Sequence, residues 1–281
     1  MKKRTAFVLM LAMICSLSAC GKAAAEPSAS PALDEVQPSE KAVELTVFAA
    51  ASMTETLNQV IELYKSAAPN VTITPTYDSS GTLMTQISEG AECDLFISAA
   101  RKQMDALDAT QAAEKNPDKL DFIDSGTRVN LLENKIVLVV PEGNPANITK
   151  FADIANAEMI ALGNSDVPVG SYSLEILKYL GLDIAALENA GKVTYGSNVK
   201  EVTTQVAEST VDCGIVYATD AFVAGLTVVD TATDDMCKKV IYPAAVLKAS
   251  KNSEAARAFL DFLKSDKAMS IFEKVGFTKA E

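Results

Sequence analysis

The sequence predicts an α/β protein with two lobes, and two observations support this prediction. Strand patterns and helix patterns alternate along the chain, which is typical of sheets whose faces are covered by helices. The second half of the chain repeats this alternation, and 281 residues are enough for two lobes of about 100 residues each. In sheets of this kind, ligands bind at the carboxyl ends of the strands.

The chain begins with the features of a bacterial export signal. Residues 2–4 are basic, and the apolar run over residues 6–16 is too short to span a bilayer. The run ends in Leu-Ser-Ala-Cys, which resembles the lipobox of bacterial lipoproteins and implies lipidation of Cys20. We therefore expect a lipoprotein signal peptide over residues 1–19 and an extracytoplasmic protein anchored to the bacterial cell membrane. An ordinary signal peptide with a chance cysteine is the alternative.

The segment after the signal is polar, and the protein as a whole is acidic. Residues 20–43 are mostly Lys, Ala, Glu, Pro and Ser, which predicts a flexible tether behind the lipidated Cys20. The net charge of −12 at pH 7 becomes more negative once the basic head is removed. An acidic chain of this kind is a poor candidate for binding nucleic acid.

The composition also argues against an enzyme. The chain has no His, which excludes His-based catalytic triads and His metal sites, and it has no Cys-x-x-Cys pair. We therefore expect no catalytic site, no cofactor and no directly coordinated metal, although Ser–Lys chemistry stays open. Three cysteines remain in the mature chain, Cys93, Cys213 and Cys237. Cys213 and Cys237 flank one excursion of the chain and are the likelier disulfide pair.

The stretch over residues 45–53 organises the first lobe. It is a strand pattern that runs through small residues into a helix with one apolar face. Ser52 and Glu55 have the spacing of a capping box, so Ser52 is either a helix cap or a ligand contact. A helix that starts after a strand presents free N–H groups and the positive end of its dipole, which together favour an anion.

Further junctions of this type follow along the chain. In the first half, strands are predicted at residues 71–77 and 91–99, and the first of these runs into a helix through Asp78-Ser-Ser-Gly-Thr82. In the second half, the predicted strands are 135–141, 159–163, 193–195 and 213–217. A late strand at 239–247 and two terminal helices have no lobe of their own, so we expect them to return to the first lobe. This predicts lobe I over 44–130 plus 238–281, and lobe II over 131–237.

Six of these segments together resemble a known family. They are Phe48–Ser52, Ser79–Leu83, Asp94–Ala99, Val167–Tyr172, Gly214–Tyr217 and Tyr242–Val246. In this order they resemble the periplasmic-type molybdate-binding proteins of ABC importers, over residues 44–278. The resemblance implies a class II periplasmic-binding-protein-like fold with an oxyanion in the interlobe cleft. It also implies an ABC transporter permease as partner, and we expect a monomer.

The resemblance further implies which groups hold the anion. Ser52 and Ser80 would donate from hydroxyl and main-chain N–H groups in lobe I. Val169 and Val199 would donate main-chain N–H groups in lobe II, together with the phenol of Tyr217. Asp78 departs from the family pattern, and we expect its carboxylate to point away from the cleft because it would repel an anion.

A site made only of donors suits a fully deprotonated tetrahedral anion. Phosphate carries a proton near neutral pH, and that proton would find no acceptor in such a site. Sulfate would have to be excluded by its smaller size. We therefore expect molybdate, and also tungstate, as the ligand. The alternative is a binding protein of the same fold for sulfate or another small anion.

Overall fold

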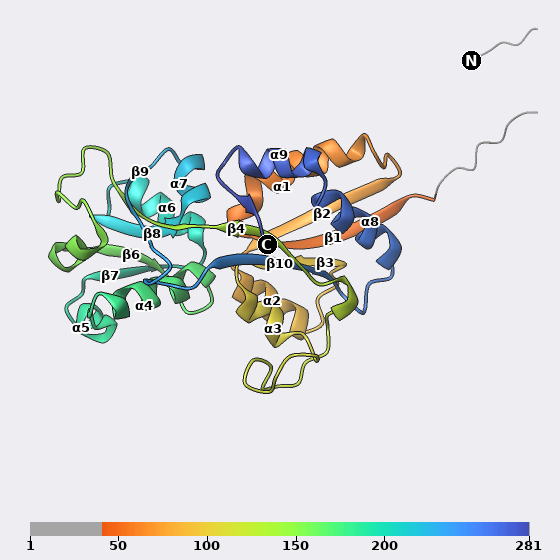
Figure 1. Ribbon diagram of the computed structural model, residues 1–281, viewed down its shortest axis with the longest axis horizontal. Coiled ribbons are helices and arrows are strands. Elements are labelled where there is room, and N and C mark those ends of the chain that lie inside the picture. Colours follow the sequence, from red (N-terminus) through yellow and green to blue (C-terminus); the bar gives the residue numbers. More distant parts are fainter. Residues whose placement is uncertain (1–40, 281) are drawn as a thin grey trace, which may run out of the picture. The chain divides into compact units, whose positions relative to one another are not determined.

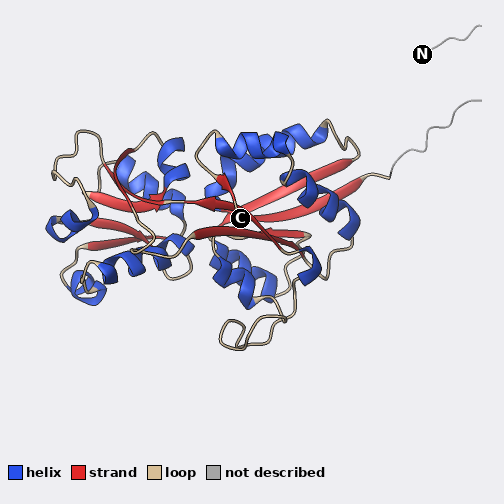
Figure 2. Ribbon diagram, in the orientation of Figure 1, coloured by secondary structure: helices blue, strands red, loops and turns tan. Residues whose placement is uncertain are grey.

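The computed structural model describes residues 41–280, which form two β-sheets with helices on their faces (Figures 1 and 2). The predicted α/β, two-lobed class of fold is confirmed. The predicted signal peptide, Cys20 and most of the predicted tether lie outside the described residues. Within residues 41–280, no helix is both long enough and apolar enough to cross a bilayer.

The first sheet has the strand order β11-β4-β10-β3-β1-β2. Its strands are β1 (Val43–Ala50), β2 (Val71–Asp78), β3 (Leu95–Ile97), β4 (Val129–Asn134), β10 (Val240–Val246) and β11 (Thr278–Lys279). The helical segments connected to it are η1 (Ala51–Met53), α1 (Thr54–Lys65), α2 (Ser80–Ser88), α3 (Arg101–Ala106), η2 (Ser125–Thr127), α8 (Ser253–Leu263) and α9 (Asp266–Glu273). β1 is parallel to β2 and β3, whereas β10 is antiparallel to β3 and β4.

The second sheet has the strand order β7-β6-β8-β5-β9. Its strands are β5 (Ile136–Val140), β6 (Ile160–Gly163), β7 (Val193–Gly196), β8 (Cys213–Tyr217) and β9 (Thr227–Thr231). Its helical segments are η3 (Phe151–Asn156), α4 (Pro168–Tyr179), α5 (Ile184–Asn189), α6 (Val199–Ala207) and α7 (Ala218–Val223). β6 is parallel to β7 and β8, and β5 is antiparallel to β8 and β9. Both sheets are therefore mixed rather than purely parallel.

The chain passes between the two sheets at two places (Figure 1). β4 ends at Asn134 in the first sheet, and β5 begins at Ile136 in the second. The chain returns between the end of β9 at Thr231 and the start of β10 at Val240. Because only these two connections join the sheets within residues 41–280, they form the hinge between the lobes.

The helix periodicity predicted after β1 is confirmed by burial. Leu57, Val60, Ile61 and Tyr64 of α1 are all buried against the first sheet. The ring of Tyr64 lies 4.9 Å from the rings of both Phe259 and Phe262, measured between centroids. α8 therefore packs beside α1, so a helix early in the described chain and a helix near its end share one apolar core.

The predicted helix cap at Ser52 is wrong. Ser52 lies in the short 3-10 turn η1, and α1 starts two residues later with Met53 as its N-cap and no side-chain cap. The extra turn displaces Ser52 from the capping position, so its hydroxyl is available for a tertiary contact. In the second junction Ser79 is the cap, because its Oγ accepts the Thr82 N–H at 3.0 Å.

The predicted disulfide between Cys213 and Cys237 is also wrong, since all three cysteines of the described chain are free. Cys213 is buried at the start of β8, in the interior of the second sheet. Cys237 is only partly buried, in the connection that leads back to β10.

An ionic cluster fixes the long irregular segment that precedes β4. Arg128 donates to Asp108 at 2.8 Å and also pairs with Asp105, and both carboxylates are buried. Asp108 additionally accepts bonds from Thr110 and Ser125. Burial raises the pKa of Asp108, but these hydrogen bonds outweigh burial and hold the pKa below its ordinary value. The cluster thus adds buried polar contacts to the small apolar core that Leu107 and Ile123 of this segment form with the first sheet.

We predict that Arg128→Met lowers the free energy of unfolding by about 3–5 kcal/mol, because it leaves the buried carboxylate of Asp108 without a cation and leaves Asp105 with only the exposed Lys115, 3.5 Å away. Urea denaturation measures the loss. The control is Arg257→Met, which breaks an exposed pair with Asp124 and should cost less than about 1 kcal/mol. Equal losses in the two variants would contradict a structural role for the buried cluster.

Candidate functional site

A small cavity lies where the strand-to-helix junctions of both lobes meet. Its lining comes from the ends of β1 and β2, from η1 and α2 in the first lobe, and from the segments around α4, α6 and β8 in the second. The lining residues are Ala50, Ala51, Ser52, Asp78, Ser79, Ser80, Ala99, Val167, Pro168, Val199 and Tyr217. The cavity volume is about 10 Å³, far below the range of roughly 300–1,000 Å³ typical of organic ligands and close to the room that one water molecule needs. The cavity therefore suits a small ion.

Ser80 lies at the start of α2 and has no exposed surface. Its Oγ accepts the main-chain N–H of Ala99, another lining residue, at 2.9 Å. A serine hydroxyl that accepts one bond still has its own proton to donate. Ser80 therefore remains a donor beside the cavity.

A chain of hydrogen bonds orients Ser52 from behind. Asn134 Oδ1 accepts the Lys135 N–H at 2.8 Å, which fixes the amide so that its Nδ2 faces Tyr242. Nδ2 lies 3.3 Å from the Tyr242 hydroxyl, and that hydroxyl lies 2.9 Å from Ser52 Oγ. Either hydroxyl can donate in the Ser52–Tyr242 contact, so this chain of bonds fixes the position of Ser52 Oγ beside the cavity.

Val199 is the first residue of α6, and its N–H is the one that the helix cap leaves free. The Asn198 side chain caps this helix by accepting the N–H groups of Lys200 at 3.0 Å and Glu201 at 3.2 Å. Among residues 41–280, no hydrogen-bond partner is found for the Val199 N–H. A free amide at a helix N-terminus is a donor for an anion.

Val169 does not itself line the cavity. Its side chain is buried, and the residues that line the cavity here are Val167 and Pro168, immediately before it. Pro168 occupies the first position of α4 and has no N–H, so Val169 carries the first amide of this helix. Gly170 lets the helix start approach β6 closely, since a Cβ there would lie 2.3 Å from the Gly163 carbonyl oxygen.

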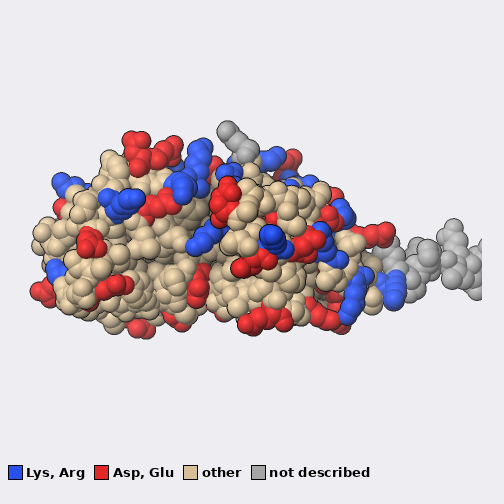
Figure 3. Space-filling model, turned by 90° about the horizontal axis from the view of Figure 1, so that it is seen from below, with Lys and Arg blue, Asp and Glu red and all other residues tan. Residues whose placement is uncertain are grey.

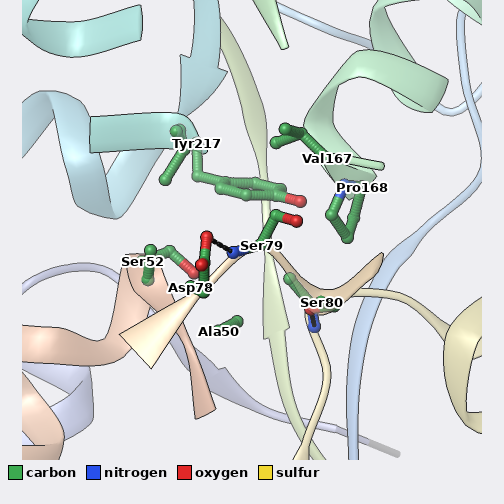
Figure 4. Close-up of a pocket in the computed structure, with 11 residues that line it drawn as sticks. Ala50, Ser52, Asp78, Ser79, Ser80, Val167, Pro168 and Tyr217 are labelled. Carbon is green, nitrogen blue, oxygen red and sulfur yellow. Dashed lines mark hydrogen bonds between the residues drawn. The ribbon is translucent and has the colours of Figure 1, made fainter. Parts of the chain in front are cut away.

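The hydroxyl of Tyr217 is the clearest unpaired group in the cavity. Tyr217 is only 1% exposed, and its hydroxyl has no hydrogen-bond partner among the described residues. Figure 4 shows this hydroxyl pointing at the space between Ser79 and Pro168. Burial raises the pKa of Tyr217 well above its ordinary value, so the group keeps its proton and can donate it. A buried orphan donor of this kind points to a ligand that accepts.

The expectation that Asp78 points away from the cleft is wrong. Asp78 is half-buried and lines the cavity, and its Oδ1 accepts the Ser79 N–H at 2.7 Å. Figure 4 shows the carboxylate between Ser52 and Ser79. This local bond turns the side chain back over its own helix start, a preference that spacing in the sequence does not reveal. The cavity therefore contains one acceptor among its donors.

Sequence comparison gives the family. Residues 45–278 match the model of the bacterial extracellular solute-binding proteins. The chain belongs to this family. It is 39% identical over 243 residues to a putative ABC transporter substrate-binding lipoprotein of Bacillus subtilis, covering 85% of this chain and 88% of the relative. It is 35% identical over 242 residues to the molybdate-binding protein ModA of Escherichia coli, covering 83% and 88%.

Solved structures agree with this assignment. The substrate-binding domain of a putative molybdenum ABC transporter from Clostridium difficile matches with a TM-score of 0.63 and 36% identity, covering 85% of this chain and all of that one. The molybdate-binding protein of Azotobacter vinelandii matches with a TM-score of 0.71 at 22% identity, which supports the fold.

The site of this solute-binding protein contains no cationic side chain. None of the lining residues is Lys or Arg. The neighbouring ammonium group of Lys200 is engaged elsewhere, 2.8 Å from Glu55 of α1 and 3.2 Å from Asp220 of α7. On the face that Figure 3 shows, acidic and basic side chains are interspersed and form no extended basic patch. A ligand in the cavity is thus met by dipoles rather than by opposite charges.

Sequence reasoning missed the residues that act behind the cavity. Tyr242 and Asn134 are buried in strands and look like core positions, although Tyr242 lies in a segment that carries the family resemblance. The sequence pattern places Ser79 in the predicted junction before α2 without singling it out, yet Ser79 lines the cavity and caps α2. A polar side chain near the end of an apolar strand was the signal available for Asn134.

The buried carboxyl group of Asp220 should make the free energy of unfolding depend on pH. It is 1% exposed, and neither carboxylate oxygen has a well-oriented hydrogen bond. Burial raises the pKa of Asp220 to about 6, although Lys200 lowers it. Because the folded state binds this proton more tightly than the unfolded state, stability should fall as the pH rises from about 4 through about 6, by on the order of 3 kcal/mol.

We predict that Asp220→Asn removes this slope, which urea denaturation at a series of pH values from 4 to 8 would measure against the unsubstituted protein. Asn has no proton to lose in that range. The same slope in both proteins would contradict the assignment to Asp220.

Proposed function

We propose that this protein is the extracytoplasmic binding component of an ABC importer, which binds a tetrahedral oxyanion and delivers it to a permease. Molybdate is the proposed ligand, with tungstate as a second ligand of nearly the same size. Relatives that carry the name molybdate-binding protein, at 35% and 33% identity, support this choice. The binding step needs no cofactor and no chemical reaction.

The observation that carries the proposal is the unpaired hydroxyl of Tyr217, in a cavity that also receives helix N-termini from both lobes. The proposed donors are Ser52 and Ser80 from lobe I, with Val169, Val199 and Tyr217 from lobe II. Each hydrogen bond to a charged partner contributes about 1.5–3 kcal/mol. Five or more such bonds are enough for micromolar or tighter binding after the cost of ordering and desolvation is subtracted.

The family and the Bacillus subtilis relative named as a lipoprotein support an outside location and a role in transport. We propose that residues 1–19 are removed on export, that Cys20 carries the lipid and that residues 20–43 tether the folded part as a monomer. Lobe I would comprise residues 44–130 plus 238–281, and lobe II residues 131–237. Ligand would favour the closed cleft because the donors of both lobes meet only there.

A second candidate follows from Asp78. An acceptor in the cavity could receive the proton of a protonated oxyanion such as hydrogen phosphate, which a site made only of donors would reject. We therefore keep a protonated small anion as the alternative ligand within the same fold.

The deciding experiment is isothermal titration of the mature domain with molybdate, tungstate, sulfate and phosphate. We expect micromolar or tighter binding of molybdate and tungstate and none of sulfate. Tight binding of phosphate alone would favour the second candidate, and no response to any of the four would refute oxyanion binding.

We predict that Tyr217→Phe weakens molybdate binding by about 1–3 kcal/mol, roughly 5- to 150-fold, because the cavity loses one donor to a charged acceptor. Titration calorimetry measures the change. Tyr195→Phe is the matched control in the same lobe, since its exposed hydroxyl bonds only to Glu188 and should leave affinity unaltered. An unchanged affinity in the Tyr217 variant would remove this hydroxyl from the site.

We predict that Asp78→Asn strengthens molybdate binding by about tenfold or more, because it removes a negative charge beside a dianion and adds an amide donor. Asp121→Asn on the exposed surface of lobe I serves as control. Weaker binding in the Asp78 variant would instead mean that the carboxylate accepts a proton from the ligand.

A further inference from the structure

The two lobes touch through their backbones at one point next to the cavity. The N–H of Gly81 in α2 donates to the carbonyl oxygen of Asp166 in the segment before α4, at 3.0 Å. Gly81 directly follows Ser80, and Asp166 directly precedes Val167, and both of these neighbours line the cavity. The contact therefore lies one residue away from the proposed ligand site on each side.

Both partners belong to segments that are held firmly. The Asn164 side chain accepts the Asp166 N–H at 2.9 Å, and the Asn164 carbonyl accepts the Val167 N–H at 3.1 Å. The Asn164 N–H in turn donates to the Gly196 carbonyl at 3.0 Å, which ties the segment to the end of β7. Gly81 lies in the first turn of α2 behind the Ser79 cap. Neither group can move aside in the way that the end of a side chain can.

Only glycine permits this approach. A Cβ at residue 81 would lie 2.3 Å from the Asp166 carbonyl oxygen, 2.8 Å from its Cα and 2.9 Å from its carbonyl carbon. Cβ contacts under 3.0 Å essentially do not occur, so any side chain would force the two backbones apart by about 0.7 Å or more. By contrast, the polar contact of Lys200 with Glu55 between the lobes joins two partly exposed side chains that can adjust.

We propose that the Gly81–Asp166 contact is the stop that sets the width of the closed cleft, and thereby the size of the anion that the cavity accepts. This inference rests on the proposed oxyanion function. Because the contact joins two backbones, it defines one closed distance between Ser80 on one wall and Val167 with Pro168 on the other. Selection between sulfate and the larger molybdate would then be decided by a residue that does not touch the ligand.

The test is Gly81→Ala, titrated with molybdate and sulfate beside the unsubstituted protein. Gly81 has helical backbone geometry, so Ala fits α2 itself and the melting temperature without ligand should not fall. We expect molybdate affinity to fall at least tenfold, and any binding of the smaller sulfate to fall at least as much, because the donors of the two lobes no longer close around one anion. Unchanged affinity for both anions would overturn the inference.

Gly126→Ala is the matched control in the same lobe. Gly126 lies in η2, where the nearest atom to a new Cβ is a side-chain oxygen of Asp124 at an unstrained 3.4 Å. This variant should bind both anions as the unsubstituted protein does.

A crystal structure of the Gly81→Ala protein separates this inference from the proposed function. We expect the backbones of residue 81 and Asp166 to be at least about 0.7 Å further apart than in the unsubstituted protein. An unchanged separation would overturn the inference, whether or not the protein binds molybdate. Failure of the unsubstituted protein to bind any oxyanion would refute the function alone.

Discussion

The cleft depends on one constraint, the need of buried hydrogen-bond donors for an acceptor. Strand-to-helix junctions of both sheets end at the same cavity, and each leaves donors that its own helix cannot use. At α6 the Asn198 side chain takes the amides of Lys200 and Glu201, so the Val199 amide is left over. At β8 the Tyr217 hydroxyl has no partner among the described residues. These leftover donors are costly without a ligand and favourable with one, which couples ligand binding to the meeting of the lobes.

The hinge and the cavity are parts of one hydrogen-bonded structure. Asn134 ends the strand by which the chain leaves the first sheet, and Tyr242 lies in the strand by which it returns. Asn134 donates to Tyr242 and also to Thr219 of α7, and Tyr242 contacts Ser52. The residues at the crossing points thus orient a donor of one lobe while they contact the other. The segments that join the two sheets are therefore hydrogen-bonded to the residues that orient the cavity.

With one exception, the charged side chains near the cavity lie beside it rather than in its lining. The ammonium of Lys200 is satisfied by Glu55 and Asp220, so it stabilises the contact between the lobes without entering the cavity. Asp78 is the exception, because its carboxylate lines the cavity and is held there by the Ser79 N–H. Neutral dipoles discriminate between ligands by geometry, whereas a nearby charge discriminates by protonation state. Both kinds of group line the cavity, so under the proposed function Asp78 is the residue that would respond to the ligand's protonation state.

Local patterns in the sequence predict the helices, the strands and the places where the chain turns. Periodicity predicted β1 with the helix that follows and the apolar strand that became β5, since these patterns depend on neighbours within a few residues. The resemblance to a known family brought Ser52, Ser80, Val169, Val199 and Tyr217 forward as candidates, and the structure gathers all of these except Val169 in the lining of one cavity.

Contacts between residues far apart in the chain could not be predicted in this way. The pairing of Ser52 with Tyr242, the cavity that Asp78 lines, the free state of Cys213 and Cys237, and the backbone contact of Gly81 with Asp166 all depend on how segments distant in the sequence pack together. No local pattern encodes such contacts, because each is fixed by the packing of segments that are up to 190 residues apart. The physical reason is that helix and strand propensities act over a few residues, whereas the size and polarity of a cavity are set by the surfaces that close it.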